Sequence, residues 1–220
     1  MIKAVLFDFD ETLQDRTLAF EGYMDAMLKR YFPDIDEKTA EQYKDDMVKT
    51  GNGGYVVRVD WYQALLEKWG YADRLSAKEL AEHYDTTFGD HNVIFEHTVP
   101  LLKELKKRGK LVGVITNGPS YLQNHKMDES GLREYCDIVV VSGDLGVHKP
   151  DKKIFEITAE RLGLKCEECV YVGDHPINDI QGALSSGMSA IRMNWGWFKD
   201  KDLRSDVPVI DDIIDVLKYI

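Results

Sequence analysis

The chain has 220 residues, of which 44% are hydrophobic and 30% are charged, and its formal net charge is -11. This length allows one large domain or a core with a smaller insert. The acidic balance is the opposite of a nucleic-acid-binding surface, so we expect no nucleic-acid partner. No apolar run approaches the roughly 20 residues that span a bilayer. The N-terminus lacks the layout of a signal peptide, so we expect a cytoplasmic protein without a membrane partner.

Short apolar runs rich in β-branched residues predict buried strands, and amphipathic stretches between them predict helices. The expected strands are residues 4–7, 111–115, 138–141, 170–172 and 189–192. The expected helices are residues 100–108, 119–130, 150–162 and 180–186, followed by a terminal helix whose apolar face runs from Ile210 to Leu217. Strands that alternate with helices predict a parallel sheet, and unbroken apolar strands predict helices on both of its faces. The fold class is therefore α/β, with a Rossmann-like parallel sheet as its core.

Residues 16–95 interrupt this alternation between the first and second strands. They predict helices over residues 18–31, 36–49 and 59–69, and a fourth that begins after Ser76, where Ser76 and Glu79 have the spacing of a capping box. No convincing strand lies among them. We therefore expect a core domain formed by residues 1–15 and 96–220 and an inserted α-helical cap domain formed by residues 16–95.

Two acidic residues, Asp8 and Asp10, stand at the end of the first apolar run. In an extended chain, residues i and i+2 point to the same side, so both carboxylates are expected on one side of the strand end. Adjacent acids at the tip of a buried strand are costly unless a cation or a reaction requires them. This pair is therefore the first candidate for a functional site.

Polar residues also follow the other predicted strands: Thr116 and Asn117 the second, Lys149 the third, and Asp174 and Asp179 the fourth. In an open parallel sheet, ligands bind outside the carboxyl ends of the strands, so these side chains should converge. Several oxygen ligands without cysteine or histidine favour Mg²⁺. Lysine and backbone N–H groups bind phosphate oxygens, and aspartate is a known nucleophile. The set therefore predicts phosphoryl transfer.

Four segments resemble the motifs of the haloacid dehalogenase-like (HAD) hydrolase superfamily, in their usual order. Phe7 to Leu13 resembles the first motif, Val114 to Gly118 the second, Lys149-Pro150 the third, and Val172 to Asp179 the fourth. The helical insert after the first strand resembles the C1 cap of subfamily I. The chain is similar to the phosphatase branch, because true dehalogenases lack an acid at the position of Asp10.

The resemblance implies a role for each acid near the first and fourth strands. Asp8 is the expected nucleophile and a Mg²⁺ ligand. Asp10 is the expected general acid and then general base, and its backbone carbonyl is a further metal ligand. Asp174 is the third expected Mg²⁺ ligand. Asp179 is expected to support either the metal site or Lys149.

The same resemblance implies that Thr116 and the backbone N–H of Asn117 hold the phosphoryl group. Lys149 is expected to bind the phosphate and to neutralise charge between it and Asp8. Two histidines beside the motifs, His148 and His175, are expected to be solvated loop residues. Trp195 and Trp197 are expected to pack on the rim of the core, the alternative being an aromatic wall at the substrate entrance.

These residues predict a Mg²⁺-dependent phosphatase that hydrolyses a small phosphate monoester through an aspartyl-phosphate intermediate. Nucleotides, flavin mononucleotide, phosphoglycolate and sugar phosphates are the expected substrate classes, and a monomer or homodimer is the expected assembly. A phosphomutase of the same superfamily is an alternative. A non-catalytic phosphate-binding protein or a phosphorylatable signalling domain is the alternative of another class. Within the insert, Tyr23, Arg58, Tyr55 and the Gly51–Gly54 turn are unranked candidates for substrate contacts.

Overall fold

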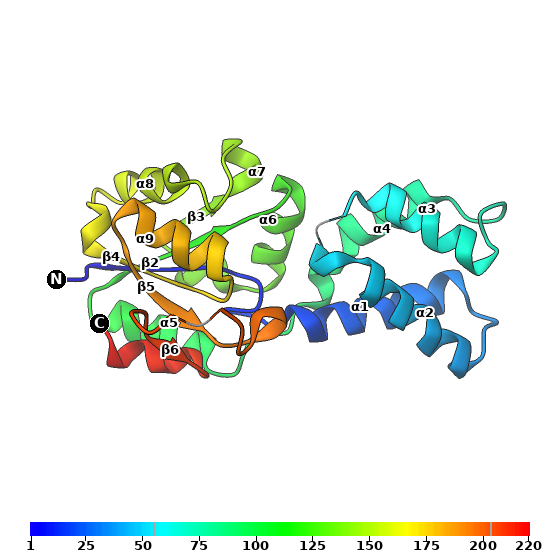
Figure 1. Cartoon of the computed structure of the whole chain (residues 1–220), viewed down its shortest axis with the longest axis horizontal. Coiled ribbons are helices and arrows are strands. Elements are labelled where there is room, and N and C mark those ends of the chain that lie inside the picture. The colour runs from blue at the N-terminus through cyan, green and yellow to red at the C-terminus, as the bar shows by residue number, and fades with distance from the viewer. Residues whose placement is uncertain (55, 203) are drawn as a thin grey trace. The chain divides into compact units, whose positions relative to one another are not determined.

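The computed structural model describes residues 1–54, 56–202 and 204–220. The chain forms two compact units, one made of Met1–Thr17 and Asn92–Ile220 and the other of Leu18–His91. The first unit contains a sheet with helices, and the second is helical (Figure 1). No helix in the described ranges is both long enough and apolar enough to cross a membrane.

The first unit is built around a parallel sheet of six strands in the order β3-β2-β1-β4-β5-β6. The strands are β1 (Ala4–Phe7), β2 (Leu111–Thr116), β3 (Ile138–Val141), β4 (Cys169–Gly173), β5 (Ser189–Met193) and β6 (Val209–Ile210). The five predicted strands and the α/β fold class are confirmed. The sequence did not predict β6, because two residues are too few to show a periodic pattern.

Helices cover both faces of this sheet, as predicted (Figure 1). Val5 and Phe7 of β1 pack with Leu101 of helix α5, while Ala4 and Leu6 pack in a second cluster on the other face. This division follows from the alternation of side chains along a strand. The helices of this unit are α5 (Thr98–Lys107), α6 (Ser120–Glu129), α7 (Ser142–Leu145), α8 (Lys152–Arg161), a π-helical turn (Pro176–Gln181) and α9 (Gly182–Ser186), with 3₁₀ turns at Leu132–Tyr135, Cys166–Glu168, Gly196–Phe198 and Ile213–Lys218.

Two helical predictions in this unit need correction. The expected terminal α-helix is a 3₁₀ helix over Ile213–Lys218, and Ile210 lies instead in β6, where it pairs with Met193. Its side chain is buried in the same core cluster as Ile213 and Val216. The helix expected from residue 180 is preceded by the π-helical turn, so helical structure begins at Pro176.

The second unit contains α1 (Arg16–Tyr31, whose first two residues belong to the first unit), α2 (Glu37–Thr50), α3 (Arg58–Trp69) and α4 (Ala77–Thr87), with 3₁₀ turns at Asn52–Gly54 and Phe88–His91. Asp36 caps α2, since its Oδ1 accepts a hydrogen bond of 2.8 Å from the backbone N–H of Thr39. Ser76 caps α4 in the same way through Glu79 N, at 3.4 Å. The interior is aromatic, and the hydroxyls of Tyr23 and Tyr62 lie 2.8 Å apart within it.

The order of the strands determines where a ligand can bind. β1 lies at the centre, and the chain proceeds from it to β2 and β3 on one side and to β4, β5 and β6 on the other. Such a reversal of strand order leaves a crevice outside the carboxyl ends of the strands. Asp8 follows β1 and Asp174 follows β4, so both lie at this reversal.

Gly113 in β2 is required by close packing within the sheet. A Cβ atom there would lie 2.7 Å from side-chain carbons of both Ile138 and Leu6. We expect Gly113→Ala to lower the free energy of unfolding by about 1–3 kcal/mol, because overpacking forces neighbours from their positions. Urea unfolding followed by circular dichroism measures this change. Gly109→Asn is the control, since that position is left-handed with no atom within 4 Å; equal stability of the Gly113 variant and wild type would contradict the prediction.

Candidate active site

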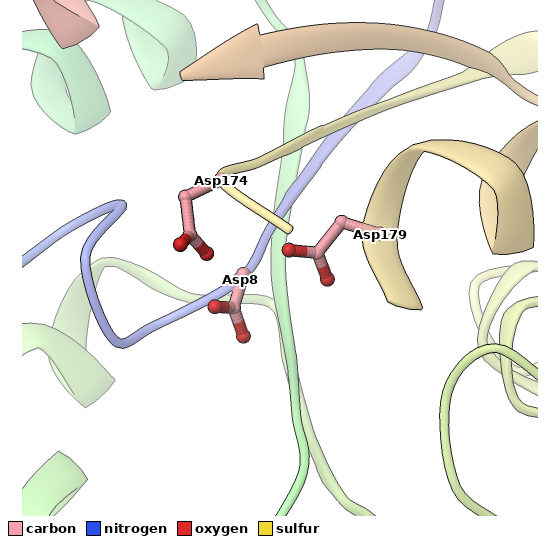
Figure 2. Close-up of side chains that lie close together, drawn as sticks. All are labelled: Asp8, Asp174 and Asp179. Carbon is pink, nitrogen blue, oxygen red and sulfur yellow. The ribbon is translucent and has the colours of Figure 1, made fainter. Parts of the chain in front are cut away.

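Three buried carboxylates meet at the reversal of strand order. Asp8, Asp174 and Asp179 each offer an oxygen that lies within 4.8 Å of the oxygens of the other two. Figure 2 shows them approaching one space from the end of β1, the loop after β4 and the following π-helical turn. A backbone hydrogen bond holds Asp8 beside β4, since Asp8 N donates to Val172 O at 2.8 Å.

The ammonium group of Lys149 lies against this cluster. Its Nζ donates to Asp8 Oδ1 at 2.6 Å, to Asp179 Oδ1 at 2.7 Å and to the Tyr171 hydroxyl at 2.9 Å. Burial disfavours the charged lysine, but Asp179 and Asp8 outweigh it and hold the pKa of Lys149 above its ordinary value. Lys149 therefore remains a cation in the interior.

The single positive charge of Lys149 does not balance the negative charges of the three carboxylates. Burial raises the pKa of Asp8, and the neighbouring Asp179 and Asp10 raise it further against the attraction of Lys149. Burial also raises the pKa of Asp174 well above its ordinary range, and Asp179 and Asp8 add to the effect. A divalent cation would relieve this repulsion, and carboxylate oxygens are the donors that Mg²⁺ prefers. The donor set therefore fits a magnesium ion.

Asn117, in the second motif, holds the backbone of Lys149 in place. The Asn117 side chain makes two hydrogen bonds to the backbone of Lys149, accepting from its N–H at 2.9 Å and donating to its carbonyl at 3.0 Å. Thr116, at the end of β2, is buried, and its hydroxyl accepts a hydrogen bond from Gln123. Thr116 and Asn117 are thus held at the same end of the sheet as the carboxylates.

Asp10 does not join the carboxylate cluster with its side chain. β1 ends at Phe7, so the alternation expected to place Asp8 and Asp10 together does not extend to Asp10. Lys126 Nζ lies 2.5 and 2.6 Å from its two oxygens, and Gln14 Nε2 lies 2.6 Å from Oδ1. Burial would raise the pKa of Asp10, but the Lys126 and Arg16 cations bring it down to about 2. Asp10 is therefore a carboxylate, the form that accepts a proton.

Sequence reasoning missed three polar residues of this region, Tyr171, Gln123 and Lys126. Tyr171 looked like one more apolar residue of β4, yet its hydroxyl donates to Ile115 O at 2.9 Å and contacts Lys149. Gln123 and Lys126 lie on the buried face of α6 with Leu122 and Met127. A glutamine and a lysine at apolar positions of a helix were the signal that could have revealed them.

The remaining candidates have mixed outcomes. Trp195 packs on the core beside Phe95, as expected, whereas Trp197 is 61% exposed, so the core-rim interpretation is wrong for it. His148 is exposed, while His175 is half-buried and its Nδ1 accepts from the backbone N–H groups of Ile177 and Asn178. In the helical unit, Tyr23 is part of the interior, Arg58 pairs with Asp85 at 3.1 Å, and Tyr55 lies outside the described residues.

Comparison with known proteins identifies the family. Residues 2–187 match the haloacid dehalogenase-like hydrolases. A glyceraldehyde 3-phosphate phosphatase from Methanopyrus kandleri is 34% identical over 98% of this chain and 94% of that protein. The pyrimidine 5'-nucleotidase YjjG from Escherichia coli is 30% identical over 86% of this chain and 85% of its own. The solved structure of the HAD-hydrolase YfnB from Bacillus subtilis has the same fold, with a TM-score of 0.79 at 22% identity over 99% of this chain and 98% of that one.

The chain therefore belongs to the haloacid dehalogenase-like hydrolases. The predicted recognition of this superfamily is confirmed, and so is the prediction of a phosphatase within it.

Gly173, at the end of β4, leaves the space that Asp179 occupies. A Cβ atom there would lie 2.5 Å from the Cβ, Cγ and Oδ2 atoms of Asp179. We expect Gly173→Ala to displace Asp179 from Lys149 and to lower phosphatase activity by about tenfold or more, since small misplacements at a reacting centre are costly. Steady-state phosphate release measures this loss. Cys169→Ala, at the other end of the same strand, is the matched control, and equal activities of the two variants would contradict the prediction.

Proposed function

We propose that the protein is a Mg²⁺-dependent phosphatase that hydrolyses a small phosphate monoester through an aspartyl-phosphate on Asp8. The observation that carries this proposal is the buried cluster of Asp8, Asp174 and Asp179 with Lys149 in contact with two of its members. Such a cluster is costly in a folded protein unless it binds a cation. A divalent cation meets this requirement, and together with Lys149 it allows an anionic phosphate monoester to bind beside the carboxylates.

The proposed reaction has two steps. A carboxylate oxygen of Asp8 attacks phosphorus, the bond from phosphorus to the ester oxygen breaks, and Asp10 gives the leaving oxygen a proton. Because Lys126 favours the carboxylate form of Asp10, the proposal requires Asp10 to take up this proton first, from solvent or from the monoanion of the substrate. Asp10, now a carboxylate, then takes a proton from the water that attacks the phosphoryl group on Asp8. Inorganic phosphate leaves, and Asp8 is regenerated.

Other residues of the site orient the phosphoryl group. In the proposal, the Thr116 hydroxyl and the Asn117 N–H bind its oxygens, and Lys149 neutralises the charge that builds up between it and Asp8. Asp179 holds Lys149 in place through the contact of 2.7 Å.

The metal site of the proposal consists of the Asp8 and Asp174 carboxylates and the backbone carbonyl of Asp10. A bound Mg²⁺ supplies the positive charge that allows a phosphate dianion to approach the Asp8 carboxylate. Asp179, whose carboxylate also belongs to the cluster, supports this site from the side of Lys149.

The proposed substrate is a small phosphorylated metabolite. Two relatives carry the names glyceraldehyde 3-phosphate phosphatase and pyrimidine 5'-nucleotidase, which are activities on small phosphate monoesters. The expected classes remain nucleotides, flavin mononucleotide, phosphoglycolate and sugar phosphates, and triose phosphates belong to the last of these. The helical unit, Leu18–His91, is proposed to act as a cap that selects among them. We further propose a cytoplasmic monomer or homodimer.

Binding of Mg²⁺ should stabilise the protein through the carboxylate cluster. We expect millimolar Mg²⁺ to raise the midpoint of thermal unfolding of the wild type, because a ligand that binds only the folded state stabilises it. Asp174→Asn should lose most of this increase. The surface variant Asp128→Asn, whose side chain is 58% exposed, should keep it. An equal increase for wild type and Asp174→Asn would place the cation elsewhere.

The covalent role of Asp8 is tested with a panel of phosphate esters. We expect Mg²⁺-dependent phosphate release from at least one small monoester, abolished by EDTA and reduced by about 10⁴-fold or more in Asp8→Asn, because an amide cannot replace the nucleophile. Release is measured colorimetrically over nucleotides, flavin mononucleotide, phosphoglycolate and triose and sugar phosphates. Isomerised product without free phosphate would support a phosphomutase instead. Equal release by wild type and Asp8→Asn would refute the proposed nucleophile.

A further inference from the structure

Lys126 is a buried lysine that none of the four motifs contains. It lies on α6 with 2% of its surface exposed, and its Nζ contacts both oxygens of Asp10 at 2.5 and 2.6 Å. The same Nζ lies 5.2 Å from the centre of the Phe9 ring. Asp10 is thus held through both of its carboxylate oxygens by one cation from a different element of the core unit.

Gln123, one helical turn earlier, extends this contact to the second motif. Its Oε1 accepts from Lys126 Nζ at 3.0 Å, and its Nε2 donates to Asp10 Oδ2 at 3.2 Å and to the Thr116 hydroxyl. One amide therefore connects the residue proposed to move protons with a residue proposed to hold the phosphoryl group. Both Gln123 and Lys126 belong to the buried face of α6, with Leu122 and Met127.

The position of Lys126 is expensive for the fold. Removing an ammonium group from water carries a large desolvation cost, and replacing a buried ion pair with apolar side chains is often neutral or stabilising. A methionine or leucine at residue 126 would continue the apolar face formed by Leu122 and Met127. Packing alone thus gives no reason for a lysine here, whereas orientation of Asp10 does.

We propose that Lys126 is a positioning residue for Asp10 and that it fixes the Asp10 carboxylate for the attack of water on the phosphorylated Asp8, with Gln123 aligning it to Thr116. This inference rests on the proposed function. In that step Asp10 must lie within hydrogen-bond reach of the attacking water and accept one of its protons. A carboxylate held by both oxygens has fewer orientations to lose, and therefore reaches this geometry at lower cost.

The test separates the two chemical steps with p-nitrophenyl phosphate. Its leaving group needs little protonation, so the first step does not depend strongly on Asp10. We expect Lys126→Met to release about one equivalent of nitrophenol per enzyme in a rapid burst, followed by turnover about 10²-fold slower than wild type, which is the size of a typical proton-transfer contribution. Stopped-flow absorbance gives the burst, and acid quenching of a reaction with substrate labelled in its phosphoryl group gives the covalent phosphoenzyme.

A second measurement asks whether Lys126 acts through Asp10. If it does, Lys126→Met should slow turnover greatly in the wild-type background but hardly at all in Asp10→Asn, because residues that act as a unit are non-additive. A merely structural lysine would give losses that multiply in the double variant. Lys107→Met is the matched control, since that side chain is 81% exposed on α5, and its turnover should equal wild type.

If circular dichroism and thermal unfolding show that Lys126→Met does not fold, Gln123→Met serves as a second variant, which removes no charge. We expect a smaller loss, about tenfold, with the same burst and the same non-additivity with Asp10→Asn. Three results would overturn the inference. The first is slow turnover with no burst of nitrophenol, and the second is a double variant whose loss of turnover is the product of the two single losses. The third is turnover equal to wild type in both Lys126→Met and Gln123→Met. Wild-type protein that releases no phosphate, or retains activity in Asp8→Asn, would instead overturn the proposed function.

Discussion

The site depends on the contact between one buried ammonium group and two buried carboxylates, Lys149 with Asp8 and Asp179. Three acids within 4.8 Å repel one another strongly where water is excluded. Lys149 compensates only part of this charge, so the cluster retains affinity for further positive charge. The chain as a whole carries a formal net charge of -11, which makes such local cations necessary if an anionic substrate is to bind.

The fold holds this unfavourable arrangement because each acid is fixed by a different rigid element. Asp8 continues β1 and is bonded to β4 through Val172, while Asp179 lies in a π-helical turn that also bonds back to His175. Gly173 provides the room for Asp179 at the end of β4. A π-helical turn at such a place agrees with the general tendency of these rare turns to occur at functional sites. The unfavourable cluster of charges is thus held at the ends of β1 and β4, two central strands in which every residue is buried.

The sequence was informative wherever the signal was local. Apolar runs identified the five longer strands, and the alternation of strands with helices predicted a parallel sheet, so Asp8, Lys149 and Asp174 could be expected at one end of it. Contacts between distant segments were not visible in this way. Tyr171 and Lys126 each occupy a position that the pattern assigns to the core, and only the partner across the fold shows what the polar atom does. The short β6 is defined by its pairing with β5, in which Ile210 lies opposite Met193, and not by periodicity in the sequence.

The two acids of the first motif illustrate how a fold separates the roles of similar side chains. Asp8 lies where burial and neighbouring carboxylates raise its pKa, whereas Lys126 and Arg16 keep Asp10 ionised against its own burial. The separation begins at Phe7, where β1 ends, so Asp10 lies outside the strand and just before Glu11, whose backbone has the left-handed φ of 58°. Asp10 pairs with Lys126 of α6, while Asp8 pairs with Lys149. Two carboxylates two residues apart thus acquire different partners, and environments that divide a pair in this way favour different chemical roles for its members. In this fold the division is made by two lysines distant in sequence, Lys149 beside Asp8 and Lys126 beside Asp10.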